Sequence, residues 1–320
     1  MTSQSGAPAI KPKTRRALVH LGAHRTGTSS LQKILRERQG ELEARNVFYQ
    51  RGHEHQNLRK LVIESRKIIQ GGQSNEPLRP ILTHIHQEFE ALKKDASDKD
   101  LLYSYEGFLG DVFLDMREGI YPNAGVMLKM LGEVFGEYDT TYLVTLRSYG
   151  EFIDSCYRYS VRWGFHKSFD VYMKGWRTGL EKNNWITLVQ SIKEHCGGNF
   201  KIFFYEDFKL RPFLIYDALV DALPQLQDVS FKYEEKENVS AGDVCSNVCR
   251  VVNNVVLRKK EIPYEHRLSL VNELNTTLER KAFMRGSRVV GFGFDMAPLT
   301  ELYESHRAIL KEEFSQQTQA

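Results

Sequence analysis

The sequence has few cysteines, no long apolar run and no large excess of charge of one sign. Four cysteines among 320 residues are too few for a disulfide scaffold. No window approaches the roughly 18 consecutive apolar residues that a membrane-spanning helix needs. Because 44 Lys and Arg residues oppose 41 Asp and Glu residues, the formal charge is only +3, too balanced for the broad basic face typical of nucleic-acid-binding proteins. Any anion site must therefore be local, and we expect no nucleic-acid partner.

A metal centre is not expected either. Cys245 and Cys249 are four residues apart and can share one face of a helix, but no histidine clusters with them. Buried cysteines of this kind usually pack as small apolar residues. The sequence therefore predicts no metal site.

The two ends of the sequence differ in composition from the rest. The opening residues, MTSQSGAPAIKPKTRR, are polar and basic, and no apolar stretch of signal-peptide length follows them. We predict a disordered basic leader over 1–16, one folded domain over 17–314 and a disordered tail over 315–320. The expected location is the cytoplasm, without a transmembrane segment.

Short apolar runs alternate with segments of helical spacing along the first two thirds of the chain. Five runs have the length of buried strands: Ala17–Gly22, Val47–Gln50, Leu101–Tyr105, Thr141–Leu146 and Phe200–Tyr205. Helical spacing occurs between them, at Ser29–Ala44, Leu58–Gln70, Pro77–Lys94, Val126–Phe135, Glu151–Val161 and Trp185–His195. The alternation predicts an α/β fold with a central parallel sheet of about five strands flanked by helices.

The last third of the sequence is typical of helices alone. The segments with helical spacing there are Phe208–Leu223, Ala241–Arg258, His266–Phe283 and Leu299–Phe314. We therefore expect a helical C-terminal part in the same domain as the sheet.

The stretch HLGAHRTGTSSLQ, residues 20–32, joins the first predicted strand to the first predicted helix. A turn at this place brings free backbone N–H groups to a helix start, where the helix dipole adds about half a positive charge. Glycine lets the backbone approach a ligand closely, and Arg25 adds a guanidinium. The hydroxyl groups that can donate to phosphate oxygens belong to Thr26, Thr28, Ser29 and Ser30. An ordinary helix cap needs only one such hydroxyl, so the loop favours an anion, and in particular a phosphate.

The loop differs from the one that binds nucleoside triphosphates. Gly22 and Gly27 keep the glycine spacing of that motif, but Thr28 stands where its lysine belongs. The cation is instead Arg25, ahead of the second glycine. The sequence therefore indicates a phosphate site of another kind.

The loop resembles the 5'-phosphosulfate loop of the sulfotransferases that use 3'-phosphoadenosine 5'-phosphosulfate (PAPS), in particular their bacterial, carbohydrate-type branch. The matching core is Arg25, Thr26, Gly27, Thr28 and Ser29, with Ser30 next to it. The resemblance implies a P-loop-like fold, PAPS as the cofactor and 3',5'-bisphosphoadenosine as its product, and no metal. Most members carry lysine where this chain has Arg25. A guanidinium keeps its proton at neutral pH, so we expect Arg25 to stabilise the leaving phosphate by charge.

A second segment, YLVTLRSYGEFIDSCYRY, also resembles this family. Its members have an arginine at the end of a strand past the midpoint and a serine eight residues later, and both bind the 3'-phosphate of the cofactor. Arg147 and Ser155 have this spacing. Arg147 would leave the carboxyl edge of a strand while Ser155 lies two turns along the next helix, so both can face one anion.

Three further segments are similar to the family in less specific ways. Glu206 and Asp207, in FKIFFYEDF, match a shared strand end, where we expect a structural role. The segment ENVSAGD resembles the one that opens the C-terminal helices of bacterial members. In RKAFMRGSRVVGFG, Arg285 and Gly286 match a late basic loop that closes the adenosine site, although a solvated charged turn is an equal alternative.

Two residues are candidates for the base that takes the proton of the acceptor. Glu106 follows the third predicted strand and matches, with Ser104, a Ser-x-Glu segment whose glutamate is the base in carbohydrate-type members. His55 precedes a predicted helix and resembles a histidine that lines the acceptor side in bacterial relatives. Aromatic residues expected near this pocket are Tyr103, Tyr105, Phe108, Tyr157, Tyr159 and Trp163.

The resemblance implies transfer of a sulfuryl group from PAPS to a hydroxyl or amine of an acceptor. The sequence does not choose between a carbohydrate, a lipid and another small molecule, and it leaves the oligomeric state open. Two alternatives remain at this stage: a nucleotide kinase with a P-loop, and a catalytically silent nucleotide-binding protein.

Overall fold

The computed structural model of the chain describes residues 15–52, 60–61, 63–64, 78–197, 199–211, 213–231, 242–280 and 289–315. No helix in these ranges is both long enough and apolar enough to cross a membrane.

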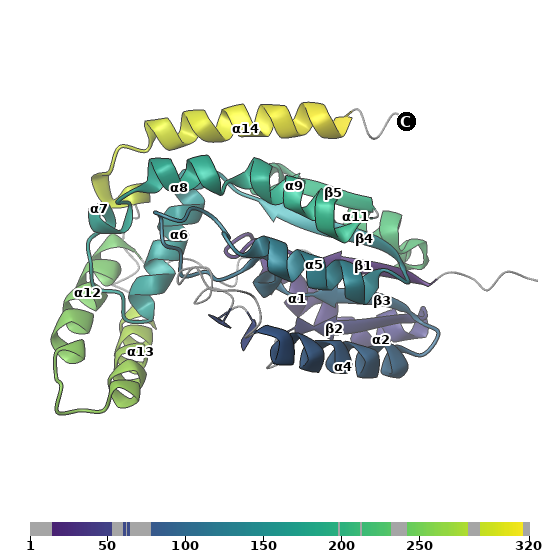
Figure 1. Cartoon of the computed structure of the whole chain (residues 1–320), viewed down its shortest axis with the longest axis horizontal. Coiled ribbons are helices and arrows are strands. Elements are labelled where there is room, and N and C mark those ends of the chain that lie inside the picture. Colours follow the sequence, from purple (N-terminus) through teal and green to yellow (C-terminus); the bar gives the residue numbers. More distant parts are fainter. Residues whose placement is uncertain are drawn as a thin grey trace, which may run out of the picture.

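Five strands form one parallel sheet in the order β2-β3-β1-β4-β5 (Figure 1). The strands are β1 (Arg16–His20), β2 (Val47–Arg51), β3 (Asp100–Ser104), β4 (Asp139–Leu146) and β5 (Asn199–Phe204). Each begins and ends within two residues of a predicted strand. The predicted α/β architecture with a five-stranded parallel sheet is thus confirmed.

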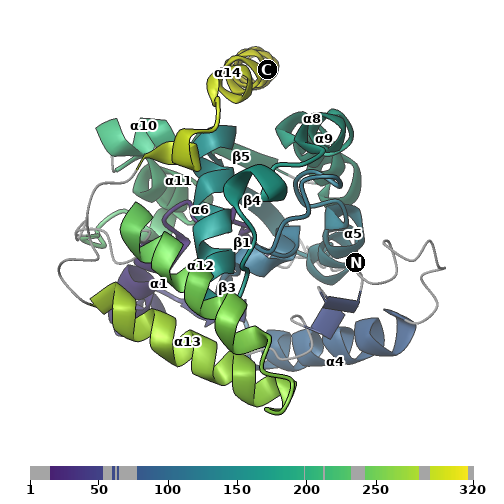
Figure 2. The same ribbon diagram turned by 90° about the vertical axis from the view of Figure 1, so that its left-hand side faces the viewer.

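Helices cover both faces of the sheet, because successive strand side chains point to opposite sides. Leu18, Leu102 and Leu143 belong to one apolar cluster, whereas Val19 and Tyr103 belong to the other. The helices on the first face are α1 (Thr28–Glu37), α2 (Gln39–Ala44) and α11 (Leu214–Ala222). Those on the second face are α4 (Arg79–Ala96), α5 (Ala124–Phe135) and α9 (Trp185–Cys196). Figure 2 shows the two helical layers on either side of the strands.

The helix α9 illustrates how local sequence sets an element boundary. Asn184 accepts hydrogen bonds from the backbone N–H groups of Ile186 (2.9 Å) and Thr187 (3.1 Å). The Thr187 hydroxyl in turn accepts one from the backbone N–H of Asn184 at 2.9 Å. This reciprocal cap satisfies N–H groups that a helix start otherwise leaves unpaired.

The order of the strands decides where a ligand can sit. β1 lies between β3 and β4, and His20 at its end is in register with Ser104 of β3. The loops that follow these three strands therefore leave the same carboxyl edge of the sheet. The chain changes direction across the sheet at β1, which is the place where ligands bind in open parallel sheets.

The C-terminal part is helical, as predicted. α12 (Asp243–Leu257) and α13 (Tyr264–Arg280) pack side by side and against α6 (Tyr149–Arg162), the helix that follows β4. α14 (Ala297–Ser315) lies over α6 and α9, along one side of the molecule (yellow in Figure 1).

Two predicted helices are each divided in two. The helix expected over Ser29–Ala44 is interrupted at Arg38, whose backbone (φ −101°, ψ 9°) leaves the helical region between α1 and α2. The helix expected over Phe208–Leu223 is α10 (Tyr205–Leu210) followed by α11. Arg211 lies between them with φ −139° and ψ 78°, because a residue before proline is disfavoured in the helical conformation.

Several short helices were not predicted. They are α7 (Phe169–Tyr172), α8 (Trp176–Lys182), η3 (Glu106–Leu109), η4 (Pro224–Leu226) and η6 (Val290–Gly293). At three to seven residues, none is long enough to show a helical period in the sequence. The helix expected over Leu58–Gln70 lies largely outside the described residues.

Two helical glycines provide a matched test of the packing between α5 and α9. A Cβ atom at Gly132 would overlap the carbonyl oxygen of His195, whereas a Cβ atom at Gly40 would meet no described atom within 4 Å. We expect Gly132→Ala to destabilise the protein by about 1–3 kcal/mol through overpacking. Gly40→Ala should stabilise it by about 0.5–1 kcal/mol, because alanine has the better helix propensity.

Urea unfolding of the two variants measures both free energies. An unchanged midpoint for Gly132→Ala would contradict the close packing of the two helices.

Candidate functional site

The loop after β1 is held in a conformation that needs glycine at two positions. Gly22 and Gly27 have positive φ angles of 54° and 88°, and Arg25 between them has φ 66°. A Cβ atom at Gly22 would lie 2.9 Å from the Thr28 hydroxyl oxygen. Positive φ favours glycine, and at Gly22 the lack of space adds to that preference.

The four hydroxyl groups of the loop divide into two pairs. Thr26 and Thr28 are buried, and both donate to the carbonyl oxygen of Ala23, at 2.7 and 3.4 Å. In this structure they therefore fold the loop on itself. Ser29 is exposed and Ser30 is half-buried at the start of α1.

The start of α1 is open to an anion. Gly27 is its N-cap and supplies no side-chain hydrogen bond, and no acidic residue lies in the first turn. The first intrahelical bonds run from the N–H groups of Ser30 and Leu31 to the Gly27 carbonyl. N–H groups that precede these bonds have no partner in the helix, and the helix dipole makes them attractive to negative charge.

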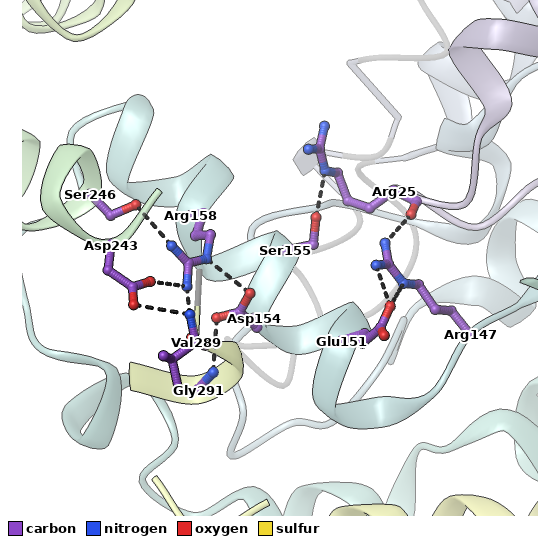
Figure 3. A network of polar contacts seen from close by, with 10 residues as sticks. All are labelled: Arg25, Arg147, Glu151, Asp154, Ser155, Arg158, Asp243, Ser246, Val289 and Gly291. Carbon is purple, nitrogen blue, oxygen red and sulfur yellow. Dashed lines mark hydrogen bonds and ion pairs between the residues drawn. The ribbon is translucent and has the colours of Figure 1, made fainter. Parts of the chain in front are cut away.

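Arg25 extends from the loop toward α6 (Figure 3). Its Nε donates to the Ser155 hydroxyl at 2.9 Å, and its guanidinium carbon lies 5.7 Å from the centre of the Tyr159 ring. Arg25 and Ser155 come from the two segments that the sequence pointed to, 130 residues apart. The fold thus brings both segments together at the carboxyl edge of the sheet.

Arg147 follows β4 directly and makes the second link between the two segments. Its Nη1 donates to the carbonyl oxygen of Arg25 at 2.6 Å. Its Nη2 and Nε both bond a carboxylate oxygen of Glu151, at 2.6 and 3.2 Å, and its guanidinium carbon lies 4.6 Å from the Tyr205 ring centre. Arg147 is only 7% exposed, so the surroundings fix its position.

Glu151 is a residue of the site that the sequence analysis missed. It lies four residues after Arg147, in the first turn of α6. The presence of an acidic residue four positions after Arg147 is the feature of the sequence from which this ion pair could have been predicted. Its carboxylate competes with any anion for Arg147, since both would use the same N–H groups.

The carboxylates of Glu206 and Asp207 have structural roles, as expected. Glu206 accepts from the backbone N–H of Ser148 at 3.0 Å and from the Tyr303 hydroxyl at 2.6 Å. Asp207 pairs with Arg307 of α14 at 2.6 Å. These bonds tie the start of α6 and the end of β5 to α14.

Glu106 lies where β3 ends, at the first position of η3, and its side chain is half-buried. The Gln32 side chain donates to one of its carboxylate oxygens at 3.0 Å and also contacts the Ser104 hydroxyl at 3.2 Å. Arg51 donates to the side-chain oxygen Oε1 of Gln32 at 3.3 Å. Gln32 therefore orients Glu106. This role of Gln32, the last residue of the stretch 20–32, was not predicted from the sequence.

Two histidines support the loop from within. His20 is buried and hydrogen-bonded through Nδ1 to the Ser104 hydroxyl at 2.9 Å. Burial lowers the pKa of His20 to about 4, although the negative charge of Glu106 opposes the shift, so the ring is neutral at pH 7. The His24 backbone N–H donates to the Tyr121 hydroxyl at 2.9 Å, and this bond ties the loop to the segment before α5.

Three predicted site residues lie outside the described residues: His55, Arg285 and Gly286. Cys245 and Cys249 are both buried, with their sulfur atoms 3.9 Å apart, and burial raises the pKa of each thiol. Within the ranges that the structure describes, no three His, Cys, Asp or Glu side chains are grouped so that they could hold a metal ion.

A buried ion network lies one turn of α6 away from Ser155 (Figure 3). Arg158 donates to Asp154 at 2.9 Å and to Asp243 of α12 at 2.7 Å, and it also reaches the Val289 carbonyl oxygen at 3.0 Å. Asp154 accepts from the Gly291 backbone N–H at 3.1 Å. The network thus fixes α6 against α12 and the segment before α14, and it positions the helix that carries Ser155.

We expect Arg158→Met to destabilise the protein by about 3–5 kcal/mol, because it leaves the fully buried carboxylate of Asp154 without its cation. Arg36→Met, on the exposed side of α1, is the matched control and should change stability by less than about 0.5 kcal/mol. Thermal and urea unfolding of the two variants measure the difference. Equal stability of the two variants would show that the network does not hold α6.

Comparisons with known proteins give weak similarities. No family model matches the chain, and no curated protein matches it. Its structure is similar to that of a sulfotransferase from Alicyclobacillus acidocaldarius, at 11% identity and a TM-score of 0.40, over 83% of this chain and 99% of that one. It is also similar to a structure of the PezAT chromosomal toxin–antitoxin system of Streptococcus pneumoniae, at 13% identity and a TM-score of 0.24, over 82% and 89%.

Proposed function

We propose that this protein is a sulfotransferase that moves a sulfuryl group from PAPS to a hydroxyl or amine of an acceptor molecule. One observation carries the proposal: Arg25 donates to Ser155, and Arg147 donates to the Arg25 carbonyl oxygen. The two segments that resemble the family's 5'- and 3'-phosphate motifs are thus in direct contact at the carboxyl edge of the sheet.

The described residues fit a nucleotide with a phosphate at each end. The open start of α1, with Arg25 beside it, suits the 5'-phosphosulfate. Arg147, which lies just before α6, and Ser155, which lies about two turns along that helix, suit the 3'-phosphate. The two guanidinium groups supply full positive charge at an edge of the sheet that already collects backbone N–H groups.

Binding would exchange contacts within the protein for contacts to the nucleotide. The Nε of Arg25 would leave the Ser155 hydroxyl, and Arg147 would leave the Glu151 carboxylate, which is about one third exposed. Arg25 and Arg147 would therefore be paired within the protein when no nucleotide is bound, and each would pair with a phosphate when it is.

When bound, PAPS supplies the sulfuryl group, and the leaving group is 3',5'-bisphosphoadenosine. Arg25 would stabilise the negative charge that grows on the leaving phosphate, since a guanidinium does not give up its proton at neutral pH. Glu106 would accept the proton of the acceptor, with Gln32 holding its carboxylate in place. His55 stays the alternative candidate for this base.

Affinity for 3',5'-bisphosphoadenosine without Mg2+ tests the binding half of the proposal. By calorimetry, Arg147→Ala should weaken binding about tenfold or more, because a charge-assisted bond contributes about 1.5–3 kcal/mol. Glu151→Gln should tighten binding severalfold, since it removes the carboxylate that competes for Arg147. Arg36→Ala is the control and should bind like the wild type.

Equal affinity of the wild type and Arg147→Ala for 3',5'-bisphosphoadenosine would contradict the assignment of Arg147 to the 3'-phosphate. If ATP with Mg2+ binds in place of the bisphosphate, the kinase alternative is favoured instead.

Transfer of radiolabelled sulfate from PAPS to a panel of acceptors tests the catalytic half. Glu106→Gln should lower the rate on the order of 100-fold or more while the affinity for the bisphosphate stays unchanged, because a general base acts only in the chemical step. A protein that binds the bisphosphate but transfers sulfate to none of the acceptors would be the silent binder. An unchanged rate would rule out Glu106 as the base.

A further inference from the structure

A second feature of the fold is a cavity of about 750 Å³ beyond the end of α6. Its walls come from three places: the segment after η3, the residues from Ser160 to Lys174, and the facing ends of α12 and α13. This volume lies within the usual range for small-molecule sites. The phosphate-binding motifs contribute no residue to its described lining.

One aromatic ring joins this cavity to the phosphate site. The Tyr159 ring lies 5.7 Å from the Arg25 guanidinium carbon. The same ring lies 5.6 Å from the ring of Phe113 and 6.2 Å from that of Trp163, and both of these rings line the cavity. Tyr159 therefore contacts both Arg25 and two rings of the cavity wall.

The cavity also adjoins the candidate base along the chain. Glu106 opens the segment that continues through η3 to Phe113 and Arg117, both of which line the cavity. Ser155 and Ser160 lie on the same helix, five residues apart, and Ser160 is a lining residue. The segment that begins at Glu106 and the helix α6 thus each contribute residues both to the cavity and to the proposed catalytic site.

Exposed aromatic rings give the cavity flat apolar surfaces. Trp163 is 43% exposed and Tyr264 is 60% exposed, although large apolar side chains are more often covered. An aromatic ring with a polar group presents both an apolar face and an edge that can form hydrogen bonds. Such surfaces suit a ligand that is itself apolar on its faces and polar on its edges, as a sugar ring is.

The described charges of the lining are mainly positive. Arg117 pairs with Asp115 at 2.9 Å, so these two charges cancel. Lys167 and Lys174 add two positive charges. Burial and the nearby charge of Lys167 lower the pKa of His166, which is therefore neutral at pH 7. An apolar ligand would cover these lysines without pairing them, at a cost in desolvation, whereas a carboxylate would pair with them.

Both lysines lie on backbone that the fold holds in place. The Tyr157 hydroxyl donates to the Lys167 carbonyl oxygen at 2.9 Å, and the Lys174 backbone N–H donates to the Val171 carbonyl oxygen at 3.3 Å. The backbone of both residues is therefore fixed, and their exposed side chains line the cavity between α6 and α8.

We propose that this cavity binds the acceptor and that the acceptor is an acidic oligosaccharide. Its sugar rings lie on Trp163 and Tyr264, its carboxylates pair with Lys167 and Lys174, and one hydroxyl reaches past Tyr159 toward Arg25 and Glu106. This inference rests on the proposed sulfotransferase function and adds the chemical class of the acceptor to it.

Binding of uronate-containing and neutral tetrasaccharides tests the inference. The acidic probes are tetrasaccharides of hyaluronan, alginate and polygalacturonate, and the neutral ones are chitotetraose and cellotetraose. Calorimetry is done on the full chain with 3',5'-bisphosphoadenosine present. At least one acidic probe should bind tenfold or more tightly than either neutral one.

Variants of the cavity should separate the contribution of the lysine charges to tetrasaccharide binding from that of the Trp163 ring. Lys167→Gln with Lys174→Gln should remove the preference for acidic probes, and Trp163→Ala should weaken both kinds of tetrasaccharide tenfold or more, with recovery in Trp163→Phe. Lys129→Gln, an exposed lysine on α5, is the control and should bind every probe like the wild type.

The affinity for 3',5'-bisphosphoadenosine itself distinguishes two kinds of failure. If the wild type binds the bisphosphate but shows no preference for acidic tetrasaccharides, the acceptor inference is wrong and the proposed function stands. An unchanged preference in the double lysine variant also overturns the inference. If the wild type does not bind the bisphosphate, the proposed function fails, and this inference fails with it.

Discussion

The hydrogen bond from the Arg147 guanidinium to the Arg25 carbonyl oxygen is the interaction on which the site depends. It joins the loop after β1 to the end of β4, two segments 122 residues apart. The carbonyl is available because Arg25 has a left-handed backbone, with glycines of positive φ on either side. Together with the bond from Arg25 to Ser155, this bond makes the open start of α1 and the helix α6 the two sides of one site.

The rest of the fold holds Arg147 where this bond requires it. The Trp185 indole N–H donates to the Arg147 carbonyl oxygen at 2.8 Å, and Glu206 binds the next backbone N–H. Glu206 in turn is bonded by Tyr303 of α14. α14 thus stabilises the site through Glu206, which fixes the backbone next to Arg147.

Local patterns in the sequence account for the five strands of the sheet, because runs of apolar residues are a local property. Glycine spacing in the loop after β1 and the separation of Arg147 and Ser155 are local as well, and the structure brings these two segments into contact. The partners of Glu106 and Arg158 were not predicted. Gln32 lies 74 residues from Glu106, and Asp243 lies 85 residues from Arg158, so only the tertiary structure brings them together. The short helices α7 and α8 were missed for a different reason, since they are too brief to show a period.

A crystal structure of the protein with 3',5'-bisphosphoadenosine tests the central claim most directly, because it locates both phosphates. The account predicts the 5'-phosphate at the backbone N–H groups that begin α1, within reach of Arg25. It predicts the 3'-phosphate between Arg147 and Ser155, with Glu151 displaced from the guanidinium. A nucleotide bound elsewhere, with the contacts of Arg147 unchanged, would contradict it.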